Sequence, residues 1–220
     1  MITLAFPLFT IRDLPIVDDG IALLRKIEFY GRHSHDAQEK QTETSWEKFL
    51  QTWVVEHGDW SITEHEKVTV IATMDRGISH EWVRHRVGSY TQESTRFVNY
   101  SKVGHGAKFV KPPMKTQVAE EVWTDAMQHA ENTYRRLLEL GEAPQIARSV
   151  LPTGLKTTIV TTFNLRNWRH FLLMRTCREA HPQIKELCVP LLAAFQERIP
   201  LLYADIIPEE PQKVAAAKAR

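Results

Sequence analysis

Residues 68–96 read VTVIATMDRGISHEWVRHRVGSYTQESTR, in which a strand pattern, a turn and a helix pattern follow one another directly. Val68 to Met74 is rich in β-branched residues, which favour a strand. Asp75-Arg76-Gly77 then turns the chain, and Ile78 to Arg86 has the spacing of a short helix. The stretch therefore predicts a strand–turn–helix unit.

The predicted helix at Ile78 to Arg86 has two different faces. Ile78 and Trp82 are one turn apart and form its buried side. A second face carries polar side chains at spacings of three and four residues, which are those of Glu81, Arg84 and His85. The helix thus leads into a polar cluster at its carboxyl end.

Residues 84–96 combine cations with hydroxyl and amide groups and have almost no large apolar side chain. A guanidinium fork matches phosphate or carboxylate oxygens two at a time, and hydroxyls and amides complete such a site. A solvated turn is the alternative interpretation, since most charge clusters are exposed. The groups concerned are Arg84, His85, Arg86, Ser89, Thr91, Gln92, Ser94 and Arg96.

Length and composition fit a soluble globular protein of 220 residues and 25.5 kDa, with 43% hydrophobic and 25% charged residues. We expect one domain spanning residues 1–220. The 28 basic and 27 acidic residues give a formal charge of +1, so anion binding must be local, and a nucleic-acid coat protein is disfavoured. Cys177 and Cys188 make neither a disulfide framework nor a zinc site, which favours a reducing cytoplasm. The short apolar start, Met1 to Phe9, indicates a first strand rather than a signal peptide or membrane span.

The rest of the chain predicts an α/β or α+β domain, with a central mixed or antiparallel sheet flanked by long helices. Strands are expected at residues 97–100 and 157–163, and the tail from residue 208 is expected to fray. The first predicted helix is capped by Asp18 and Asp19 and ends at Gly31, and the second begins at a capping box of Thr44 and Glu47 and ends at Gly58. Further helices are predicted at residues 116–140, after Pro144 and at residues 164–177. A last helix follows Pro182 and is expected to kink at Pro190. The wide apolar stripe of residues 116–140 suits burial against more than one neighbour, a second subunit among them.

Two histidine pairs invite a metal interpretation, and we expect no metal site at either. His33 and His35 lack a third obvious ligand, whereas zinc requires three or four. His80 and His85 resemble a zinc-protease motif, but they are five residues apart, which turns the second ring away from the face of the first.

Arg84-His85-Arg86, followed after seven residues by Ser94, resembles the Arg-His-Arg-x7-Ser signature of the flavin-dependent thymidylate synthases. Further segments are similar to that family in the same order, and together they cover about half of the chain. These are residues 75–81, Gln92 to Arg96, Asn99 to Lys102, Arg148 with Leu151-Pro152, and Asn164 to Arg175.

The resemblance implies a homotetramer of α/β subunits in which FAD and a nucleotide are bound where subunits meet. It implies the conversion of dUMP to dTMP with 5,10-methylenetetrahydrofolate as carbon donor and NADPH as reductant, in the cytoplasm, with neither a nucleic-acid nor a membrane partner. Matching residues place Ser61, Glu64, Arg84, His85, Arg86, Val87, Asn164, Arg166 and His170 around FAD. The residues placed around the nucleotide are Glu81, Arg84, Gln92, Ser94, Arg96, Arg148 and Arg175.

The implied ligands agree with the charges of this chain. Arg84 and Arg86 suit the FAD phosphates, and Arg96 with the Ser94 hydroxyl suits the phosphate of dUMP. Arg175 is the expected catalytic residue, because a permanent cation beside uracil stabilises negative charge on the base and raises electron density at C5. Flavin would supply the redox chemistry.

Ser94 as a nucleophile on uracil C6 remains an alternative. A serine nucleophile needs an adjacent general base, whereas Gln92 takes no proton and Glu93 is expected to point away in an extended segment. Cys177 and Cys188 stand in no recognisable nucleophile context.

The chain departs from the family pattern at three positions and has a known variant of it at His80-Glu81. Gln92 stands where Glu is frequent, Asp59 where His is frequent near FAD, and Phe97 where Tyr is frequent. Two other functions stay open, namely a sister flavoenzyme that modifies another pyrimidine nucleotide and a non-catalytic nucleotide- or RNA-binding protein. Base selectivity and salt dependence distinguish them.

Overall fold

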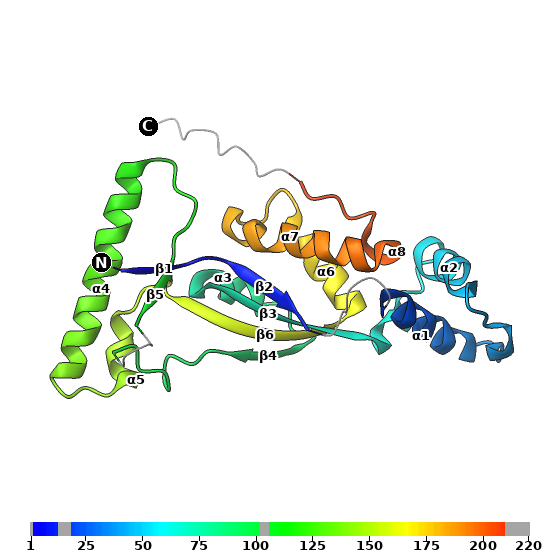
Figure 1. Cartoon of the computed structure of the whole chain (residues 1–220), viewed down its shortest axis with the longest axis horizontal. Helices are drawn as coiled ribbons and strands as arrows, with labels where there is room; N and C mark the ends of the chain where they lie inside the picture. The colour runs from blue at the N-terminus through cyan, green and yellow to red at the C-terminus, as the bar shows by residue number, and fades with distance from the viewer. Residues whose placement is uncertain (1, 13–18, 102–105, 210–220) are drawn as a thin grey trace. The chain divides into compact units, whose positions relative to one another are not determined.

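The computed structural model describes residues 2–12, 19–101 and 106–209 (Figure 1). The cap predicted at Asp18, the family-like Lys102 and the tail beyond Glu209 lie outside the described residues. The chain divides into two compact units, the first formed by residues 1–10 and 71–161 and the second by residues 11–70 and 162–220. The mixed α/β class is confirmed, whereas the single domain over 1–220 stays a prediction. No helix in the described ranges is long and apolar enough to cross a membrane.

Two sheets provide the framework. In the smaller, β1 (Thr3–Ala5) pairs in parallel with β5 (Lys108–Val110). The larger sheet has the order β2-β3-β6-β4, with β2 at Leu8–Ile11, β3 at Lys67–Asp75, β6 at Lys156–Asn164 and β4 at Ser89–Gln92. The strands predicted at the amino terminus and at residues 68–74 and 157–163 are confirmed. The strand predicted at residues 97–100 is wrong, because this segment is a turn that follows β4.

The two long strands, β3 and β6, run antiparallel. The hydroxyl of Thr69 is 3.0 Å from that of Thr162, and the hydroxyl of Thr73 is 3.3 Å from that of Thr158. Residue numbers thus increase along β3 while those of the paired residues in β6 decrease, which is the pattern of antiparallel strands. Side chains along both strands alternate between buried and half-buried positions. Threonine suits this setting because it is β-branched and its hydroxyl finds a cross-strand partner.

The first unit has its own apolar core against α4, the helix Gln117–Glu139. Thr116 caps this helix by accepting a hydrogen bond from the Ala119 amide at 3.2 Å. The prediction for residues 116–140 is confirmed, and Figure 1 shows α4 beside the β1–β5 pair. The described core residues are Tyr100, Ala107, Phe109, Met127, Tyr134, Ala147 and Leu155.

One end of the α4 stripe is exposed. The side chains of Val118 and Val122, one turn apart, are 67% and 66% exposed. The predicted burial of α4 against a second neighbour is therefore not met inside the described chain. Pro144 opens α5 (Pro144–Ala147) as predicted, and a 3₁₀ turn, η4 (Arg148–Val150), follows.

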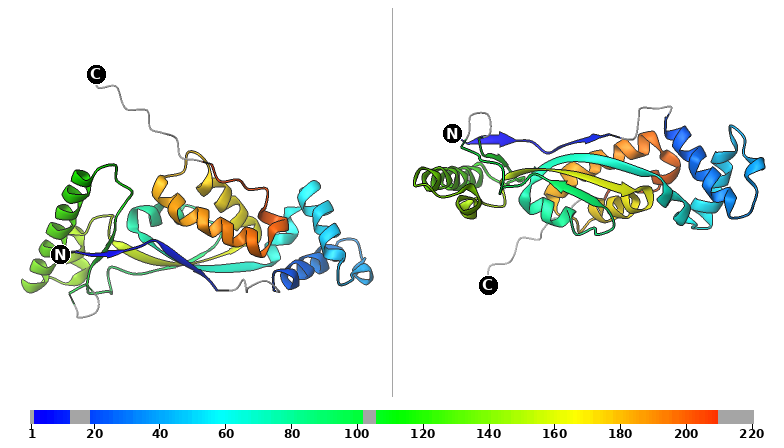
Figure 2. Two further views of the ribbon diagram at one scale, coloured as in Figure 1. Left: turned by 45° about the horizontal axis from the view of Figure 1, so that its top comes forward. Right: turned by 90° about the horizontal axis from the view of Figure 1, so that it is seen from below.

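In the second unit, α6 (Leu165–Thr176), α7 (Pro182–Arg198) and α8 (Pro200–Tyr203) lie side by side, as Figure 2 shows. Aromatic packing joins these helices. Trp168 lies at its centre, with ring centroids 5.4 Å from Phe171 and 5.6 Å from Phe195, and Phe195 lies 5.0 Å from Tyr203. The helices predicted at 164–177 and after Pro182 are confirmed, and α8 was not predicted.

The helices α1 (Asp19–His33) and α2 (Ser45–Leu50) belong to the same unit. Gly31 does not end α1 as predicted, because the helix continues to His33. Glycine fits this position because a Cβ there would come within 2.9 Å of the Phe49 ring. Leu24 and Ile27 of α1 are buried, whereas Ile21 and Phe29 are exposed. A π-helix, η2 (Gln51–Glu56), continues α2, and Gly58 ends it with a positive φ of 83°.

The capping box predicted for Thr44 and Glu47 is wrong. The Thr44 side chain accepts no capping hydrogen bond. Instead, Thr42 and Ser45 exchange hydrogen bonds, each backbone amide donating to the other hydroxyl, at 2.8 and 3.1 Å. The Thr42 side chain, from the loop before α2, thus accepts a hydrogen bond from a backbone amide at the start of the helix, which is the role that the sequence predicted for Thr44.

The expected fraying does not begin at residue 208. The Glu209 amide donates to the Thr176 carbonyl at 3.0 Å, and the ammonium of Lys185, only 6% exposed as a residue, donates to the Glu209 carbonyl at 2.6 Å.

A buried hydrogen bond in the first unit makes the role of β6 testable. The indole N–H of Trp82 donates to the hydroxyl of Thr161 at 2.9 Å, and both residues are fully buried. Thr161→Val keeps the shape but removes the acceptor, so we expect a loss of about 1–3 kcal/mol in the free energy of unfolding, measured with urea. Thr91→Val on exposed β4 is the control and should cost less than about 0.5 kcal/mol. Equal stability losses in the two variants would contradict this role.

Candidate functional site

The helix that precedes the basic cluster is α3 (Arg76–Trp82). Asp75 caps it, since its carboxylate accepts a hydrogen bond from the Ile78 amide at 2.9 Å. The helix therefore begins and ends earlier than predicted, and Arg84 and His85 lie in the turn that follows. The shared helical face predicted for Glu81, Arg84 and His85 is wrong, because only Glu81 is helical.

The Arg-His-Arg turn is held at its base by Tyr90. The Tyr90 hydroxyl lies 2.5 Å from the His85 carbonyl and 3.2 Å from the Trp82 carbonyl, so it can donate to either. Arg84, Arg86 and Val87 are exposed around this anchored backbone. An anchored turn with two exposed guanidinium groups is suited to binding an anion.

Gln92, at the end of β4, joins three elements of the first unit. Its side-chain amide donates to the Ser79 hydroxyl at 2.8 Å and to the Thr157 hydroxyl at 3.2 Å. The Ser79 hydroxyl in turn donates to the Arg76 carbonyl at 2.9 Å. A carboxylate has no hydrogen to donate to these hydroxyl oxygens, which explains how a glutamine fits at position 92 in this chain.

Residues 94–96 form a turn that brings Arg148 close. The Ser94 hydroxyl accepts a hydrogen bond from the Arg96 amide at 3.2 Å, and a guanidinium nitrogen of Arg148 donates to the buried Thr95 hydroxyl at 2.8 Å. The guanidinium of Arg96 is exposed and stacks over the Phe97 ring at 5.4 Å. The structure thus gathers three predicted nucleotide residues, Ser94, Arg96 and Arg148, around one turn.

Glu93 turns away from that group, as predicted. Its carboxylate pairs with Lys156 at 2.5 Å and accepts a hydrogen bond from the Tyr100 hydroxyl at 3.0 Å. Burial, followed by the charge of Glu93, raises the pKa of Tyr100 far above its ordinary value. Among the described residues no general base contacts the Ser94 hydroxyl, so the alternative of Ser94 as a nucleophile gains no support.

The second unit holds the other predicted flavin residues. Asn164 caps α6 by accepting a hydrogen bond from the Asn167 amide at 2.8 Å. Arg166, on the first turn, pairs with Glu64 of the 3₁₀ helix η3 (Trp60–His65) at 2.6 Å, and both side chains are about half exposed. His170 is exposed and Arg175 is partly buried farther along α6.

Ser61, also in this unit, lines a pocket of about 270 Å³. Asp59, one of the departures from the family pattern, lies in the same pocket. Among the described residues that line it, Ser34, Phe49 and Trp53 come from neighbouring helical segments. The predicted FAD contact Ser61 and the departure position Asp59 therefore border one cavity rather than a flat surface.

Sequence reasoning missed the residues that support the site. Ser79, Thr95 and Thr157 are buried hydroxyl residues that each hold a predicted site residue or its neighbour. The alternation along β6 indicates that Thr157 is buried, but the hydrogen-bond partners of all three residues are distant in the sequence. No group of three metal-ligating side chains occurs within the described ranges.

Comparison with known proteins now identifies the family. Residues 22–201 match the family described as "Thymidylate synthase complementing protein", and the chain belongs to this family. The flavin-dependent thymidylate synthase of Sulfolobus acidocaldarius is 37% identical over 158 residues, which are 70% of this chain and 60% of that protein. The chain thus spans about three fifths of that relative. The namesake from Geobacter sulfurreducens is 30% identical over 195 residues, or 88% of this chain and 84% of that protein.

A solved structure confirms the fold. The UMP/dUMP methylase PolB from Streptomyces cacaoi, bound with 5-Br dUMP, superimposes with a TM-score of 0.76 at 23% identity. The match covers 92% of this chain and 96% of that chain.

The Gln92 hydrogen bonds give a second test. Gln92→Leu keeps much of the side-chain volume but removes both donors, so we expect unfolding to require about 1–2 kcal/mol less, measured by urea denaturation. Gln145→Leu, at an exposed position of α5 in the same unit, should change stability by less than about 0.5 kcal/mol. A Gln92 variant as stable as this control would show that the hydrogen bonds are not needed to hold β4.

Proposed function

We propose that the protein is a flavin-dependent thymidylate synthase that converts dUMP to dTMP. In this reaction 5,10-methylenetetrahydrofolate gives the carbon, and NADPH reduces the bound FAD. The observation that carries the proposal is the anchored Arg84-His85-Arg86 turn followed by the Ser94–Arg96 turn with Arg148 beside it, in a chain of this family.

The chain offers suitable groups for FAD. Arg84 and Arg86 are exposed cations on a fixed backbone, which suits a pyrophosphate. His85, Val87, Ser61, Glu64, Asn164, Arg166 and His170 complete the proposed set. The Arg166–Glu64 pair holds its donor and acceptor groups in a defined geometry, and the flavin, when bound, supplies the redox chemistry.

For the nucleotide, Arg96 and the Ser94 hydroxyl would bind the phosphate. Arg148, held on Thr95, adds a second cation at the same turn, and guanidinium groups are well matched to phosphate oxygens. Glu81, Arg84 and Gln92 are the remaining proposed contacts in this unit. The side-chain NH₂ group of Gln92 donates hydrogen bonds to Ser79 and Thr157, so its carbonyl oxygen is the group that would face the ligand.

Arg175 is the proposed catalytic residue. A guanidinium stays charged at every relevant pH, so beside the uracil it would stabilise negative charge on N3 and the carbonyl oxygens. This raises electron density at C5, where the new carbon–carbon bond forms.

The proposed assembly is a cytoplasmic homotetramer with shared active sites. The exposed valines of α4 support a subunit contact, because Val118 and Val122 present an apolar strip at one end of a long helix. Cys177 is a free thiol, in keeping with a reducing compartment.

The proposed activity is tested with the purified chain. We expect yellow protein with flavin absorbance that forms dTMP from dUMP, methylenetetrahydrofolate and NADPH, and that transfers deuterium from the reduced flavin into dTMP. UMP and dCMP serve as competing substrates, because base and sugar selectivity separate this enzyme from a sister flavoenzyme. Colourless protein that takes up no added FAD would contradict the proposal, as would salt-sensitive binding to RNA without selectivity for a base.

Two variants separate catalysis from binding. Arg175→Ala should keep FAD bound but lose most turnover, because the charge on the base is no longer stabilised. Ser94→Ala should weaken dUMP binding about tenfold to a hundredfold, as expected for one lost hydrogen bond to a charged group, and should keep turnover at saturating dUMP. Steady-state kinetics measures both. Complete loss of turnover in the Ser94 variant would instead support a nucleophilic serine.

A further inference from the structure

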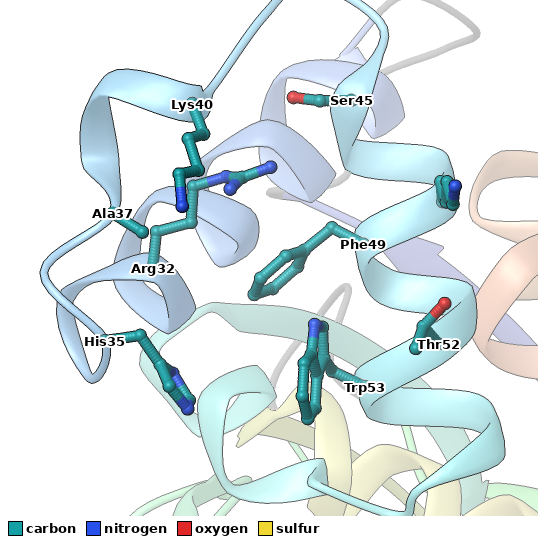
Figure 3. Close-up of a pocket in the computed structure, with 9 residues that line it drawn as sticks. Arg32, His35, Ala37, Lys40, Ser45, Phe49, Thr52 and Trp53 are labelled. Atoms are coloured by element: carbon teal, nitrogen blue, oxygen red, sulfur yellow. The ribbon is translucent and has the colours of Figure 1, made fainter.

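The cavity that Figure 3 shows between α1 and α2 adjoins the pocket of the proposed flavin contacts. Its volume is about 440 Å³, and α1, the 3₁₀ turn η1 (Gln38–Lys40), α2 and η2 border it. Its lining residues His35, Phe49 and Trp53 also line the pocket that holds Ser61. The cavity therefore belongs with those contacts. The first unit, by contrast, holds a cluster of charged and phenolic groups that none of the proposed contacts uses.

Glu93, the residue directly before the turn that we propose for the nucleotide phosphate, is held at its backbone and at its side chain. Its amide donates to the Thr158 carbonyl of β6 at 2.8 Å, and its carbonyl accepts from the Arg76 guanidinium at 3.3 Å. One carboxylate oxygen pairs with the Lys156 ammonium at 2.5 Å, and the other accepts from the Tyr100 hydroxyl at 3.0 Å. Groups from separate elements of the first unit thus fix one residue.

Tyr100 closes the loop that contains this turn. Its hydroxyl reaches back to Glu93, so one hydrogen bond joins the residues on either side of 94–99. The Tyr100 amide donates to the Tyr134 hydroxyl of α4 at 3.2 Å. Burial, followed by the charge of Glu93, raises the pKa of Tyr100, so its hydroxyl keeps its proton and remains a donor. A loop that is closed in this way has little freedom left to lose when a ligand binds.

The negative charge of Glu93 must be offset if the next residue is to bind a phosphate. A carboxylate and a phosphate repel one another, and the repulsion grows where water is partly excluded. The side chains of Glu93 and Lys156 are only 20% and 23% exposed. Loss of Lys156 would therefore leave a partly buried carboxylate without its counter-charge, one residue from Ser94.

We propose that Lys156 and Tyr100 are positioning residues for the phosphate of dUMP. Both act through Glu93, whose carboxylate Lys156 neutralises and Tyr100 holds, and they thereby fix the start of the turn that carries Ser94 and Arg96. Neither Lys156 nor Tyr100 is a proposed ligand contact. The inference rests on the proposed function, because it takes this turn as the site of the nucleotide phosphate.

The role of Lys156 is tested by calorimetric titration of the full-length, FAD-saturated chain with dUMP. Lys156→Met keeps the side-chain length but removes the charge and the donors, so we expect dUMP affinity to fall at least about fivefold. Lys156→Arg keeps both and should stay within about twofold of the wild type. The matched control is Lys111→Met, which breaks the more exposed ion pair with Glu120 in the same unit and should leave dUMP affinity unchanged.

Two further variants separate the charge of Glu93 from its hydrogen bond. Glu93→Gln/Lys156→Met leaves no unpaired carboxylate and keeps an acceptor for Tyr100, so it should bind dUMP more tightly than Lys156→Met alone. Tyr100→Phe removes only the hydroxyl that closes the loop. We expect it to weaken dUMP binding at least about twofold.

The nucleoside 2′-deoxyuridine, which lacks the phosphate, distinguishes positioning of the turn from a general loss of structure. Its affinity should be the same in the wild-type chain and in Lys156→Met, because the contacts with base and sugar are kept. FAD affinity, followed by flavin absorbance, and turnover at saturating dUMP should also be kept. Only the affinity for dUMP should fall.

The inference is overturned if Lys156→Met or Tyr100→Phe binds dUMP as tightly as Lys111→Met does. It is also overturned if Lys156→Met loses affinity for dUMP and for 2′-deoxyuridine by the same factor, or if the double variant binds dUMP no better than Lys156→Met. A wild-type chain that forms no dTMP, but whose dUMP affinity depends on Lys156 and Tyr100 as expected, would refute the proposed function and leave this inference standing.

Discussion

The pairing of β3 with β6 is the constraint on which the site residues depend. Each strand has nine residues, and each ends in a polar side chain that caps the next helix. Asp75 accepts from the Ile78 amide and starts α3, and Asn164 accepts from the Asn167 amide and starts α6. The register of the two strands therefore fixes where two helices begin. One is α3, which precedes the Arg-His-Arg turn, and the other is α6, which carries Arg175.

Buried hydroxyl groups give this framework its specificity. Thr161 satisfies the indole of Trp82, while Thr157 and Ser79 hold the amide of Gln92. Slipping β6 by one residue would turn the Thr157 and Thr161 hydroxyls to the other face of the sheet and leave the buried indole N–H of Trp82 without its acceptor. Because such contacts hold the backbone, the cationic side chains of residues 84–96 can face the solvent.

Local patterns predicted much of the fold, and long-range contacts account for most of the errors. The period of the apolar residues correctly indicated α4, α6 and α7, and the Arg-His-Arg-x7-Ser spacing indicated the family. The start of α3 was missed because Asp75 proved to be a cap rather than part of a turn. The capping box at Thr44 failed because Thr42 and Ser45 cap one another and Ser45 also binds Glu28, seventeen residues away. Arg148 could be assigned by resemblance, but its contact with Thr95, across 53 positions, could not be read from spacing.

We propose that two turns of one segment bind different ligands, with residues 84–87 binding FAD and residues 94–96 binding the nucleotide phosphate. A crystal structure of the chain with FAD and dUMP tests it most directly. The account predicts the pyrophosphate of FAD within hydrogen-bond distance of Arg84 or Arg86, and the phosphate of dUMP on the Ser94 hydroxyl and the Arg96 guanidinium. A structure with both ligands bound and the dUMP phosphate away from residues 94–96 would contradict it.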